Sequence, residues 1–413
     1  MTYLVVDAMR ERTRADWRWL PLRRVARLRR ERNVGSRATL LALGSEDGVR
    51  PRPDDGGRQL PSEATIEDYW LVRRNDLVFN PMWAIGRGVA VSNVAGAVST
   101  AYRVYEPGPV LHPRYLHHYM RSDPVVEQYS LVVRGLTTFD RSVTRDDLDA
   151  LPIPLPPLPE QRAIAGFLDA ETARIDALIT KKHRLIELLD DWEQRTLLDA
   201  LGDWREGRSR SLRQYGTSVL TGPFGTVLSA EEYVQGGVPL INPTHIVRGK
   251  LVHEPHVSVT ESVARRIGRH RLRVGDIVMG RKGDVGRSAV VPPESDGWLC
   301  GSDSIAIRCN RSLLEPRFLA TALHVGVYRQ QLVKHSTGAT LANVNEPTLL
   351  ALRLPDCALV DQHAALDWAA RRRSDRDGVV GRLGRQIDLL VEHRQALITA
   401  AVTGELSVPG VAA

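Results

Sequence analysis

Apolar residues recur at helical spacing over a long stretch in the middle of the chain. The pattern begins at Ile164, and no glycine or proline interrupts it between Phe167 and Leu201. Such a run predicts one helix of about 40 residues, on the order of 60 Å long. Positions 168, 175, 182 and 189, with positions 171, 178, 185 and 192, form a heptad seam that includes the polar Glu171 and Lys182. A long core helix would also fit, but the length favours a spacer or a coiled-coil partner.

A proline-rich segment, "LPIPLPPLP" at 151–159, precedes this helix. Proline fixes φ and moves the preceding residue out of the helical region, so the segment is expected to be extended and not a central strand. Pro159 suits the first helical position, and Glu160 then lies in the first turn, where the helix dipole favours an acidic group.

The same pattern returns about 200 residues later. "IPLPPLPEQRAIAGF" at 153–167 aligns with "LPDCALVDQHAALDW" at 354–368, and "IELLDDWEQ" at 186–194 with "IDLLVEHRQ" at 387–395. Upstream, "NDLVFNPMWAIGRGVAV" at 75–91 aligns with "GDIVMGRKGDVGRSAVV" at 275–291, and "HPRYL" at 112–116 with "EPRFL" at 315–319. Collinear matches at four places indicate a tandem duplication of a unit made of a globular domain, a proline-rich segment and a helix.

The duplication divides the chain into four parts. We expect globular domains at 1–150 and 206–350, and helices with their flanking segments at 151–205 and 351–413. The second helix departs from the pattern, because "ARRRSDRDGVVGRLGRQ" at 370–386 contains Gly378, Gly381 and Gly384. An interior glycine costs up to about 1 kcal/mol relative to alanine, so a kink or fraying is expected there, with 387–402 the secure part.

Composition bounds the class of protein. A length of 413 residues allows two to four domains. There is no apolar run of 18 residues, and the N-terminus "MTYLVVDAMRERTR" is unlike a signal peptide. The three cysteines, Cys300, Cys309 and Cys357, lack metal-ligand spacing, which predicts a reducing compartment without disulfides or a zinc site. We therefore expect a cytoplasmic protein.

The net charge of +7 comes from the two globular segments and not from the helices. A basic face on a globular domain points to a polyanion, most simply a nucleic acid. Arginine enrichment from a GC-rich genome would explain "PLRRVARLRRERN" at 21–33 equally well. It explains the concentration of charge in the globular segments less well.

The sequence offers no convincing active site. "DLVFNPMW" at 76–83 is like the Asn-Pro-Pro-aromatic turn of amino-methyltransferases, but it lacks the second proline, and the repeat partner "IVMGRKG" lacks the motif. "IGRGVA" at 85–90 is only a Gly-x-Gly. No Walker-type loop, serine elbow or metal-binding histidine pair is recognisable, so no catalytic or metal-ligating residue is assigned.

Taken together, these segments resemble the specificity subunit of Type I restriction–modification systems. The most specific pieces are 153–189, "GPFGTVL" at 222–228, 275–291 and "RQALITAAVTGEL" at 394–406. The resemblance implies an α+β fold with two tandem target recognition domains, each followed by a long helix, and an antiparallel coiled-coil spacer. It implies a non-catalytic DNA-recognition role in phage defence, in which each domain reads one half of a bipartite site. The implied partners are double-stranded DNA, two methyltransferase subunits and a restriction/translocase subunit, with S-adenosylmethionine, ATP and Mg on those subunits and no cofactor in this chain.

Candidate DNA-contacting residues are basic or polar side chains in loops, since arginine and lysine bind phosphates and guanine edges and amides suit adenine. They are Arg87, Arg281, Lys282, Arg287, Asn80, Thr137, Thr138, Asn242, Thr244, Thr337 and Asn343. Arg87 and Arg287 are expected at matching positions in the two halves, whereas Asp76 and Asp276 are expected to be turn residues. The helix pair and the partner-docking surface are expected to use Phe167, Leu168, Leu178, Leu185, Leu189, Ile387, Leu390 and Leu397.

Three other interpretations remain open. The chain could be a DNA-binding module of another defence or methylation complex, which an accompanying methyltransferase gene would argue against. It could be a degenerate methyltransferase, which binding of S-adenosylmethionine would support. It could be a coiled-coil scaffold, which an absence of DNA affinity would support.

Overall fold

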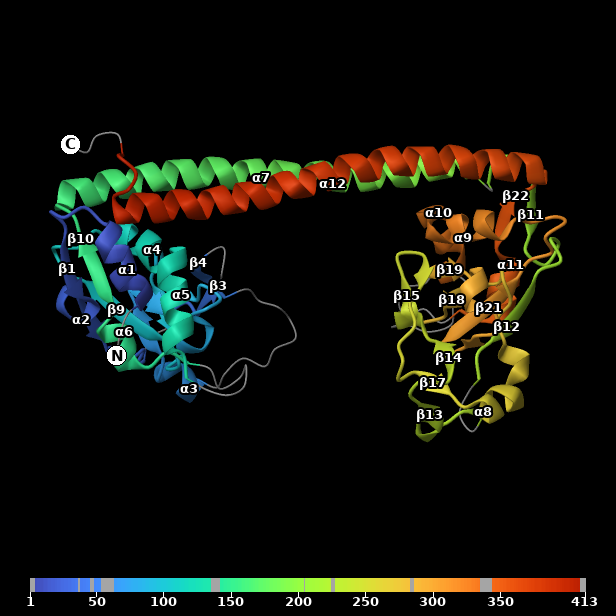
Figure 1. The fold of residues 1–413 in the computed structure, drawn as a ribbon, viewed down its shortest axis with the longest axis horizontal. Coiled ribbons are helices and arrows are strands. Elements are labelled where there is room, and N and C mark those ends of the chain that lie inside the picture. Colours follow the sequence, from blue (N-terminus) through green and yellow to red (C-terminus); the bar gives the residue numbers. More distant parts are fainter. Residues whose placement is uncertain are drawn as a thin grey trace. The chain divides into compact units, whose positions relative to one another are not determined.

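The computed structural model describes the chain except residues 1–3, 36–37, 45–47, 53–62, 135–141, 204, 224–226, 283–285, 335–343 and 409–413. It divides into two compact units (Figure 1). Unit 1 comprises Met1–Lys182 with Gly384–Ala413, and unit 2 comprises His183–Leu383. The boundaries fall inside two long helices, so each helix contributes one half to each unit, which differs from the four-part division expected from the sequence. Helices and antiparallel strands occur in both units, and the predicted α+β class is confirmed.

Unit 1 is built on a four-stranded sheet of order β2-β9-β6-β7, in which all neighbours are antiparallel. The elements that precede its long helix are α1 (Leu4–Arg12), β1 (Arg18–Pro21), α2 (Leu22–Val25), β2 (Ala26–Arg29), β3 (Leu41–Gly44), β4 (Gly48–Pro51), α3 (Glu63–Glu67), β5 (Trp70–Val72), β6 (Leu77–Phe79), η1 (Pro81–Trp83), β7 (Val89–Val91), β8 (Gly96–Val98), β9 (Arg103–Pro107), α4 (Pro113–Met120), α5 (Asp123–Val132), α6 (Arg145–Asp149) and β10 (Pro152–Leu155).

Unit 2 repeats this sheet with the order β12-β21-β18-β19. Its elements between the long helices are β11 (Ser209–Ser211), β12 (Ser218–Thr221), η3 (Ala230–Glu232), β13 (Tyr233–Val234), β14 (Val238–Ile241), η4 (Pro243–His245), β15 (Ile246–Val247), β16 (Lys250–Leu251), β17 (Ser258–Val259), α8 (Glu261–Arg266), η5 (Gly268–His270), β18 (Ile277–Gly280), β19 (Ser288–Val290), η6 (Pro293–Ser295), β20 (Leu299–Cys300), β21 (Ser304–Arg308), α9 (Pro316–His324), α10 (Gly326–Lys334), α11 (Glu346–Ala351) and β22 (Arg353–Pro355). A second sheet, of order β13-β17-β14-β20, is added in this unit.

Both faces of each four-stranded sheet are buried. Along β6, Leu77 and Phe79 join one hydrophobic cluster while Val78 joins another. In β18 the same division separates Ile277 and Met279 from Val278. Successive strand residues point to opposite faces, so a run of apolar residues marks a strand that is covered on both sides. This explains why the "DLVF" and "DIVM" stretches are continuous apolar runs and do not alternate with polar residues.

The proline-rich segments form short strands in two-stranded ladders, as their prolines require. β10 pairs with β1 and β22 pairs with β11, both antiparallel. Proline cannot donate a ladder hydrogen bond, which restricts such segments to edges.

Each proline-rich segment leads into a long helix, α7 (Leu158–Leu201) or α12 (Leu359–Thr403), shown in green and red in Figure 1. In unit 1, Asp176 of α7 binds Arg394 of α12 at 2.7 Å, and Lys182 binds Gln386 at 2.7 Å. The later residue of α7 contacts the earlier residue of α12. The two helices therefore run in opposite directions within this unit.

In unit 2 the helices are joined by Glu193 with Arg373 at 2.7 Å and by Asp190 with Arg376. α12 is helical throughout, including its three glycines, so the expectation of fraying there is wrong. The ion pairs to α7 and the burial of Leu383 stabilise the stretch that intrinsic propensity disfavours.

One of the two columns of the predicted heptad seam of α7 agrees with the burial of its side chains. Positions 168, 175, 182 and 189 are buried or half-buried, but the second column runs through 172, 179, 186 and 193 and not through 171, 178, 185 and 192. The side chains of Leu178 and Leu185 are 47% and 44% exposed, so the prediction that they build the helix pair is wrong. Ile179 and Ile186, one residue further on, take those places.

The remaining predicted helix residues divide into two groups. Phe167, Leu168 and Leu397 pack into the hydrophobic core of unit 1. Leu189, Ile387 and Leu390 are half-buried on the helices. Within the described residues, no helix combines the length and apolarity needed to cross a membrane.

Candidate nucleic-acid interface

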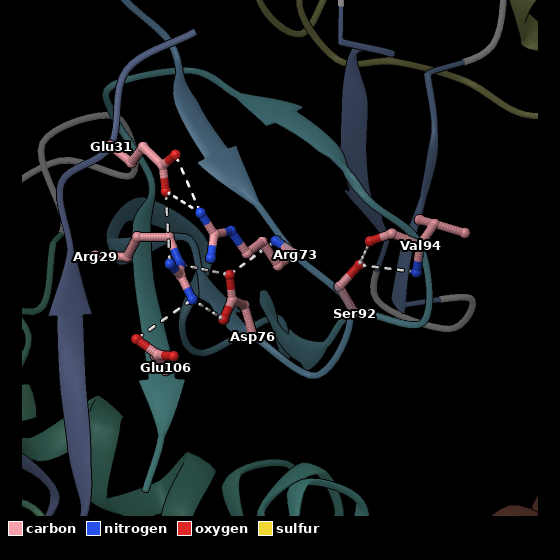
Figure 2. A network of polar contacts seen from close by, with 7 residues as sticks. All are labelled: Arg29, Glu31, Arg73, Asp76, Ser92, Val94 and Glu106. Carbon is pink, nitrogen blue, oxygen red and sulfur yellow. Dashed lines mark hydrogen bonds and ion pairs between the residues drawn. The ribbon is translucent and has the colours of Figure 1, made fainter.

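A buried aspartate directly precedes β6 in unit 1 and β18 in unit 2. In unit 1, Asp76 accepts hydrogen bonds from the backbone N–H of Arg73 at 2.8 Å and from Nε and Nη2 of Arg29 at 2.8 and 3.1 Å (Figure 2). Glu31 and Glu106 surround the Arg29 guanidinium at 3.6 and 3.4 Å. Asp76 therefore closes the turn that starts β6, and this is the role expected from the sequence.

Asp276 makes the equivalent turn with the backbone N–H of Arg273 at 2.9 Å. Its guanidinium partner is Arg308, whose Nε and Nη2 donate at 2.9 and 2.6 Å. By strand register, Arg308 of β21 corresponds to Glu106 of β9, and Leu220 of β12 corresponds to Arg29 of β2. The buried carboxylate is therefore at the same position in both units, but its guanidinium partner comes from β2 in unit 1 and from β21, the equivalent of β9, in unit 2.

The strand that the aspartate opens ends in a tight loop, which in unit 1 joins β6 to β7. The Asn80 side chain accepts a hydrogen bond from the N–H of Met82 at 3.1 Å, and its own N–H donates to Gly88 O at 2.7 Å. A Cβ atom on Gly86 would lie 1.8 Å from Trp83 Nε1, and one on Gly88 would lie 2.6 Å from Trp83 O. Only glycine fits at both positions, so the loop is folded tightly around Trp83.

This loop presents apolar side chains to solvent. Met82, Trp83 and Ile85 are 58%, 54% and 41% exposed. The sequence predicts DNA contacts for Asn80 and Arg87 in this stretch but does not predict the exposure of these apolar side chains. The available signal was large apolar residues beside an Asn-Pro turn, where polar residues are usual.

Arg87 lies in the same loop at a positive φ of 59°. Its guanidinium donates to the carbonyl oxygen of Arg121 and pairs with Asp123 at 2.5 Å, at the junction of α4 and α5. These contacts give Arg87 a structural role in holding the loop. A DNA contact by Arg87 stays a prediction.

The β18–β19 loop occupies the equivalent place in unit 2. Strand register sets Arg287 opposite Gly280, as Gly88 is opposite Asn80. Arg287 therefore corresponds to Gly88, and the expectation that Arg87 and Arg287 match is wrong. The loop of unit 1 is one residue longer, which an ungapped comparison of the sequences cannot detect.

Several of the predicted polar and basic residues gather at this loop. Arg281 donates its N–H to Asp303 O at 3.0 Å, and the Lys282 ammonium pairs with the Asp303 carboxylate at 2.9 Å. Asn242 packs against Gly301, where a Cβ would lie 2.1 Å from its Oδ1. Thr244 is exposed in the 3₁₀ turn that follows Asn242.

The turn at 242–245 also reaches the end of β18, because a Cβ on Gly280 would lie 3.2 Å from Pro243. The structure thus brings Asn242, Thr244, Arg281 and Lys282 together around residues 301–303. Arg287 is exposed at the far end of the same loop.

Four predicted residues, Thr137, Thr138, Thr337 and Asn343, lie outside the described residues. The segments that follow them return to the two loops in the same way. The N–H of Val143 donates to Pro81 O at 3.1 Å, and the N–H of Val344 donates to Arg281 O at 2.9 Å. Pro81 and Arg281 are therefore equivalent positions with different chemistry.

No group of three or more metal-ligating side chains occurs among the described residues. Burial raises the pKa of the Cys300 and Cys309 thiols to about 12, so both are protonated at neutral pH and poor ligands or nucleophiles. What the described sites offer is hydrogen-bond donors, exposed cations and exposed apolar groups. This chemistry suits binding of a polar, anionic surface with stacked bases.

The comparisons with known proteins agree with this chemistry. Residues 125–188 match the model of the Type I restriction modification DNA specificity domain. The chain is 26% identical over 199 residues to the specificity subunit of the Type I restriction enzyme StySPI from Salmonella potsdam, a match that covers 46% of this chain and 42% of that relative. The chain therefore spans less than half the length of this curated relative.

Two solved structures share the fold. A chain from work on complex assembly and conformational transition of the type I R-M system has a TM-score of 0.73 at 18% identity, covering 95% of this chain and 99% of that chain. The HsdS subunit from Thermoanaerobacter tengcongensis has a TM-score of 0.51 at 19% identity, covering 95% and 98%. Residues 125–188 are thus similar to the Type I DNA specificity domain, and the chain shares the fold of these solved structures. The resemblance to Type I specificity subunits inferred from the sequence is confirmed.

Proposed function

We propose that this chain is the DNA sequence-recognition subunit of a Type I restriction–modification complex. The observation that carries the proposal is the repeated sheet, which has the same strand order in both units and holds a loop of different chemistry at the same edge. One loop offers Asn80, Met82 and Trp83, and the other offers Arg281 and Lys282. A constant scaffold with variable loops is suited to sequence reading, because loops on a rigid sheet can change without loss of the fold.

Each unit would read one half of a bipartite site. Arginine and lysine suit guanine edges and phosphates, while asparagine suits adenine, and apolar side chains contact thymine methyl groups. Because the loops differ at equivalent positions, the two half-sites are expected to differ in sequence.

The long helices would fix the gap between the half-sites. A helix of 44 residues is about 66 Å long. Half-sites one helical turn of DNA apart are separated by about 34 Å. An antiparallel pair of such helices is long enough to act as a spacer between two recognition domains.

The outer face of α7 would dock the methyltransferase subunits. Leu178, Leu185, Leu188 and Trp192 are exposed at spacings of seven, three and four residues, which places them on one face of the helix. Exposed apolar stripes of this kind mark sites of protein association. The internal repeat suits two copies of one partner. A restriction/translocase subunit would complete the assembly.

In this proposal the chain has no catalytic role. S-adenosylmethionine, ATP and Mg would be bound by the partner subunits, and the chain would act in the cytoplasm with its DNA target. The DNA-binding module of another defence or methylation complex is the main alternative. A degenerate methyltransferase is less favoured, and binding of S-adenosylmethionine to the isolated chain would support it.

The test is single-molecule methylome sequencing of a host that expresses the chain with its candidate methyltransferase, compared with the same host lacking only this chain. Loss of methylation at a bipartite motif with a fixed gap is the expected result. Exchange of residues 1–150 for those of a relative with a different motif should then change one half only. Unchanged methylation after the deletion would overturn the proposal.

A further inference from the structure

Four exposed arginines lie in α2, in β2 and directly after β2 in unit 1. We call Arg23, Arg24, Arg27 and Arg30 the β2 basic edge. All four are exposed, and none forms an ion pair with another described residue. By contrast, Arg29 in the same run is half-buried and bound to Asp76.

The β2 basic edge lies at an end strand of the sheet. β2 is the end strand in the order β2-β9-β6-β7, so one of its sides faces no other strand of that sheet. Arg23, Arg24 and Arg27 line an open hollow of about 790 Å³, and Arg27 and Arg30 line a second of about 450 Å³.

Two carboxylates line the larger hollow, but both are engaged by other groups. Asp149 accepts hydrogen bonds from the Tyr105 hydroxyl at 2.7 Å and from Arg145 at 3.1 Å. Glu106 lies 3.4 Å from Arg29. The β2 basic edge therefore retains an excess of positive charge that faces solvent.

Unit 2 keeps only one of these four charges at the matching positions. The N–H of Leu22 donates to Leu151 O, and the N–H of Leu212 donates to Leu352 O, which aligns the two segments. Strand register separately aligns β2 with β12, and unit 2 has one residue more than unit 1 between these two anchors. The resulting equivalences are Arg23 with Arg213, Arg24 with Gln214, Arg27 with Ser218 and Arg30 with Thr221.

A genome-wide bias toward arginine would act on both halves of the duplication alike. Three of the four arginines are instead replaced by uncharged polar residues in unit 2. The β2 basic edge is therefore a property of unit 1, and its charge calls for an anionic partner.

The position of the β2 basic edge relative to the loop between β6 and β7 indicates which anion the edge binds. Arg29 is opposite Val104, so the next residue, Arg30, is level with Arg103 and hence with Phe79, just before Asn80. Arg27 is opposite Glu106, about 10 Å further along the strand at roughly 3.3 Å per residue. The basic edge therefore starts at the level of the proposed recognition loop and extends away from it.

We propose that the β2 basic edge binds the DNA phosphate backbone beside the half-site read by unit 1, outside the recognised bases. The inference rests on the proposed function. Exposed arginines without neighbours that fix their orientation supply charge but little geometric selection, which is how phosphate contacts act. Unit 2 makes no such contact, so the complex holds DNA asymmetrically.

The test uses the complex of this chain with its methyltransferase subunits and duplexes that contain the methylated motif. The variant Arg24→Gln/Arg27→Ser/Arg30→Thr installs the unit 2 residues. Arg10→Gln/Arg265→Gln/Arg382→Gln removes the same charge from exposed arginines on three separate elements. Arg24→Lys/Arg27→Lys/Arg30→Lys keeps the charge of the edge.

On a duplex with long flanks, the first variant should bind at least about tenfold more weakly. The slope of log Kd against log salt should fall by about two to three, given about 0.9 per phosphate contact. The dispersed control and the lysine variant should bind like the wild type. The methylated motif should stay the same in all of them.

Flank length separates this contact from base reading. Trimming the flank beside the unit 1 half-site should weaken wild-type binding and remove the difference between wild type and variant. Trimming the other flank should preserve that difference. The inference is overturned if the variant matches the dispersed control, if its defect persists on the trimmed duplex, or if it fails to assemble with its partners. Failure of the wild type to select any motif would instead overturn the proposed function.

Discussion

Gln161 and Gln362 make the same three hydrogen bonds in the two units. Gln161 Oε1 accepts from the N–H of His112 at 2.7 Å, and its Nε2 donates to Val110 O and Pro156 O at 2.9 Å each. Gln362 repeats this with the N–H of Glu315 at 2.9 Å and with two carbonyl oxygens, those of Leu313 at 3.0 Å and Cys357 at 3.1 Å. Both side chains are almost fully buried. Each glutamine ties the start of a long helix to the preceding segment and to the globular domain.

Replacing either glutamine should therefore loosen the joint between domain and helix. Gln161→Ala leaves one buried N–H and two carbonyl oxygens without their partner, which should cost about 2–4 kcal/mol. Urea unfolding of the variant measures the loss. Gln235, which is exposed, provides the control, because Gln235→Ala should change stability by less than about 0.5 kcal/mol. Equal effects of the two substitutions would contradict this role for Gln161.

The buried aspartates allow a test by exchange. Arg29→Leu gives unit 1 the residue found at the matching position of unit 2 and leaves Asp76 buried without its guanidinium. Removing one partner of a buried pair costs about 3–5 kcal/mol. Adding Glu106→Arg places a guanidinium where Arg308 stands in unit 2, and it should recover most of the loss. If the double variant is no more stable than the single one, the equivalence of the two networks is wrong.

The two leucines that the sequence placed in the helix pair should behave as surface residues. Leu178→Ala and Leu185→Ala should change unfolding free energy little, because both side chains are exposed, yet they should weaken assembly with the methyltransferase. Ile179→Ala and Ile186→Ala should leave assembly with the methyltransferase unchanged. Each should lower the free energy of unfolding by about 1–2 kcal/mol, since both side chains are half-buried. Thermal unfolding and size-exclusion chromatography of the complex separate the two effects.

The sequence determines part of this structure and leaves other parts open. The duplication, the buried strands and both long helices follow from apolar patterns that persist over many residues. The second column of the α7 seam lies one residue after the predicted one. Heptad spacing alone cannot decide between them, because it allows both 171 and 172 as partners of 168. The pairing of Arg87 with Arg287 failed because one residue is inserted between strands whose register only the fold shows. The burial of Gln161 and the transfer of a cation from Arg29 to Arg308 depend on contacts between segments distant in the sequence.

Acid should weaken unit 1 through the histidines of α4. Burial lowers the pKa of His117 and His118, and the nearby cations Arg114 and Arg121 act in the same direction, while Asp169 opposes them. The folded state then binds fewer protons than the unfolded state, so stability is full above about pH 6.5 and falls as pH decreases, by up to about 1.4 kcal/mol per pH unit for each group. Burial raises the pKa of Asp169, but hydrogen bonds from His118 and Arg114 outweigh this and lower the pKa below its ordinary value. Asp169 therefore contributes to the pH dependence only at more acidic pH.

Denaturant unfolding between pH 7.5 and 5 measures this dependence. His117→Gln/His118→Gln should flatten the decline. His183→Gln, at an exposed position on α7, should leave the decline unchanged. A decline of equal steepness in the double histidine variant would assign the acid sensitivity to other groups.

The most direct test of the central claim asks whether the unit 2 loop reads one half of the target. Methylome sequencing would compare a host carrying the wild-type chain with one carrying Arg281→Ala/Lys282→Ala. Each lost base contact should cost about 1–3 kcal/mol of discrimination. The account predicts relaxed sequence preference in one half of the bipartite motif, with the other half and the gap unchanged. Relaxation of both halves, or a motif identical to that of the wild type, would contradict it.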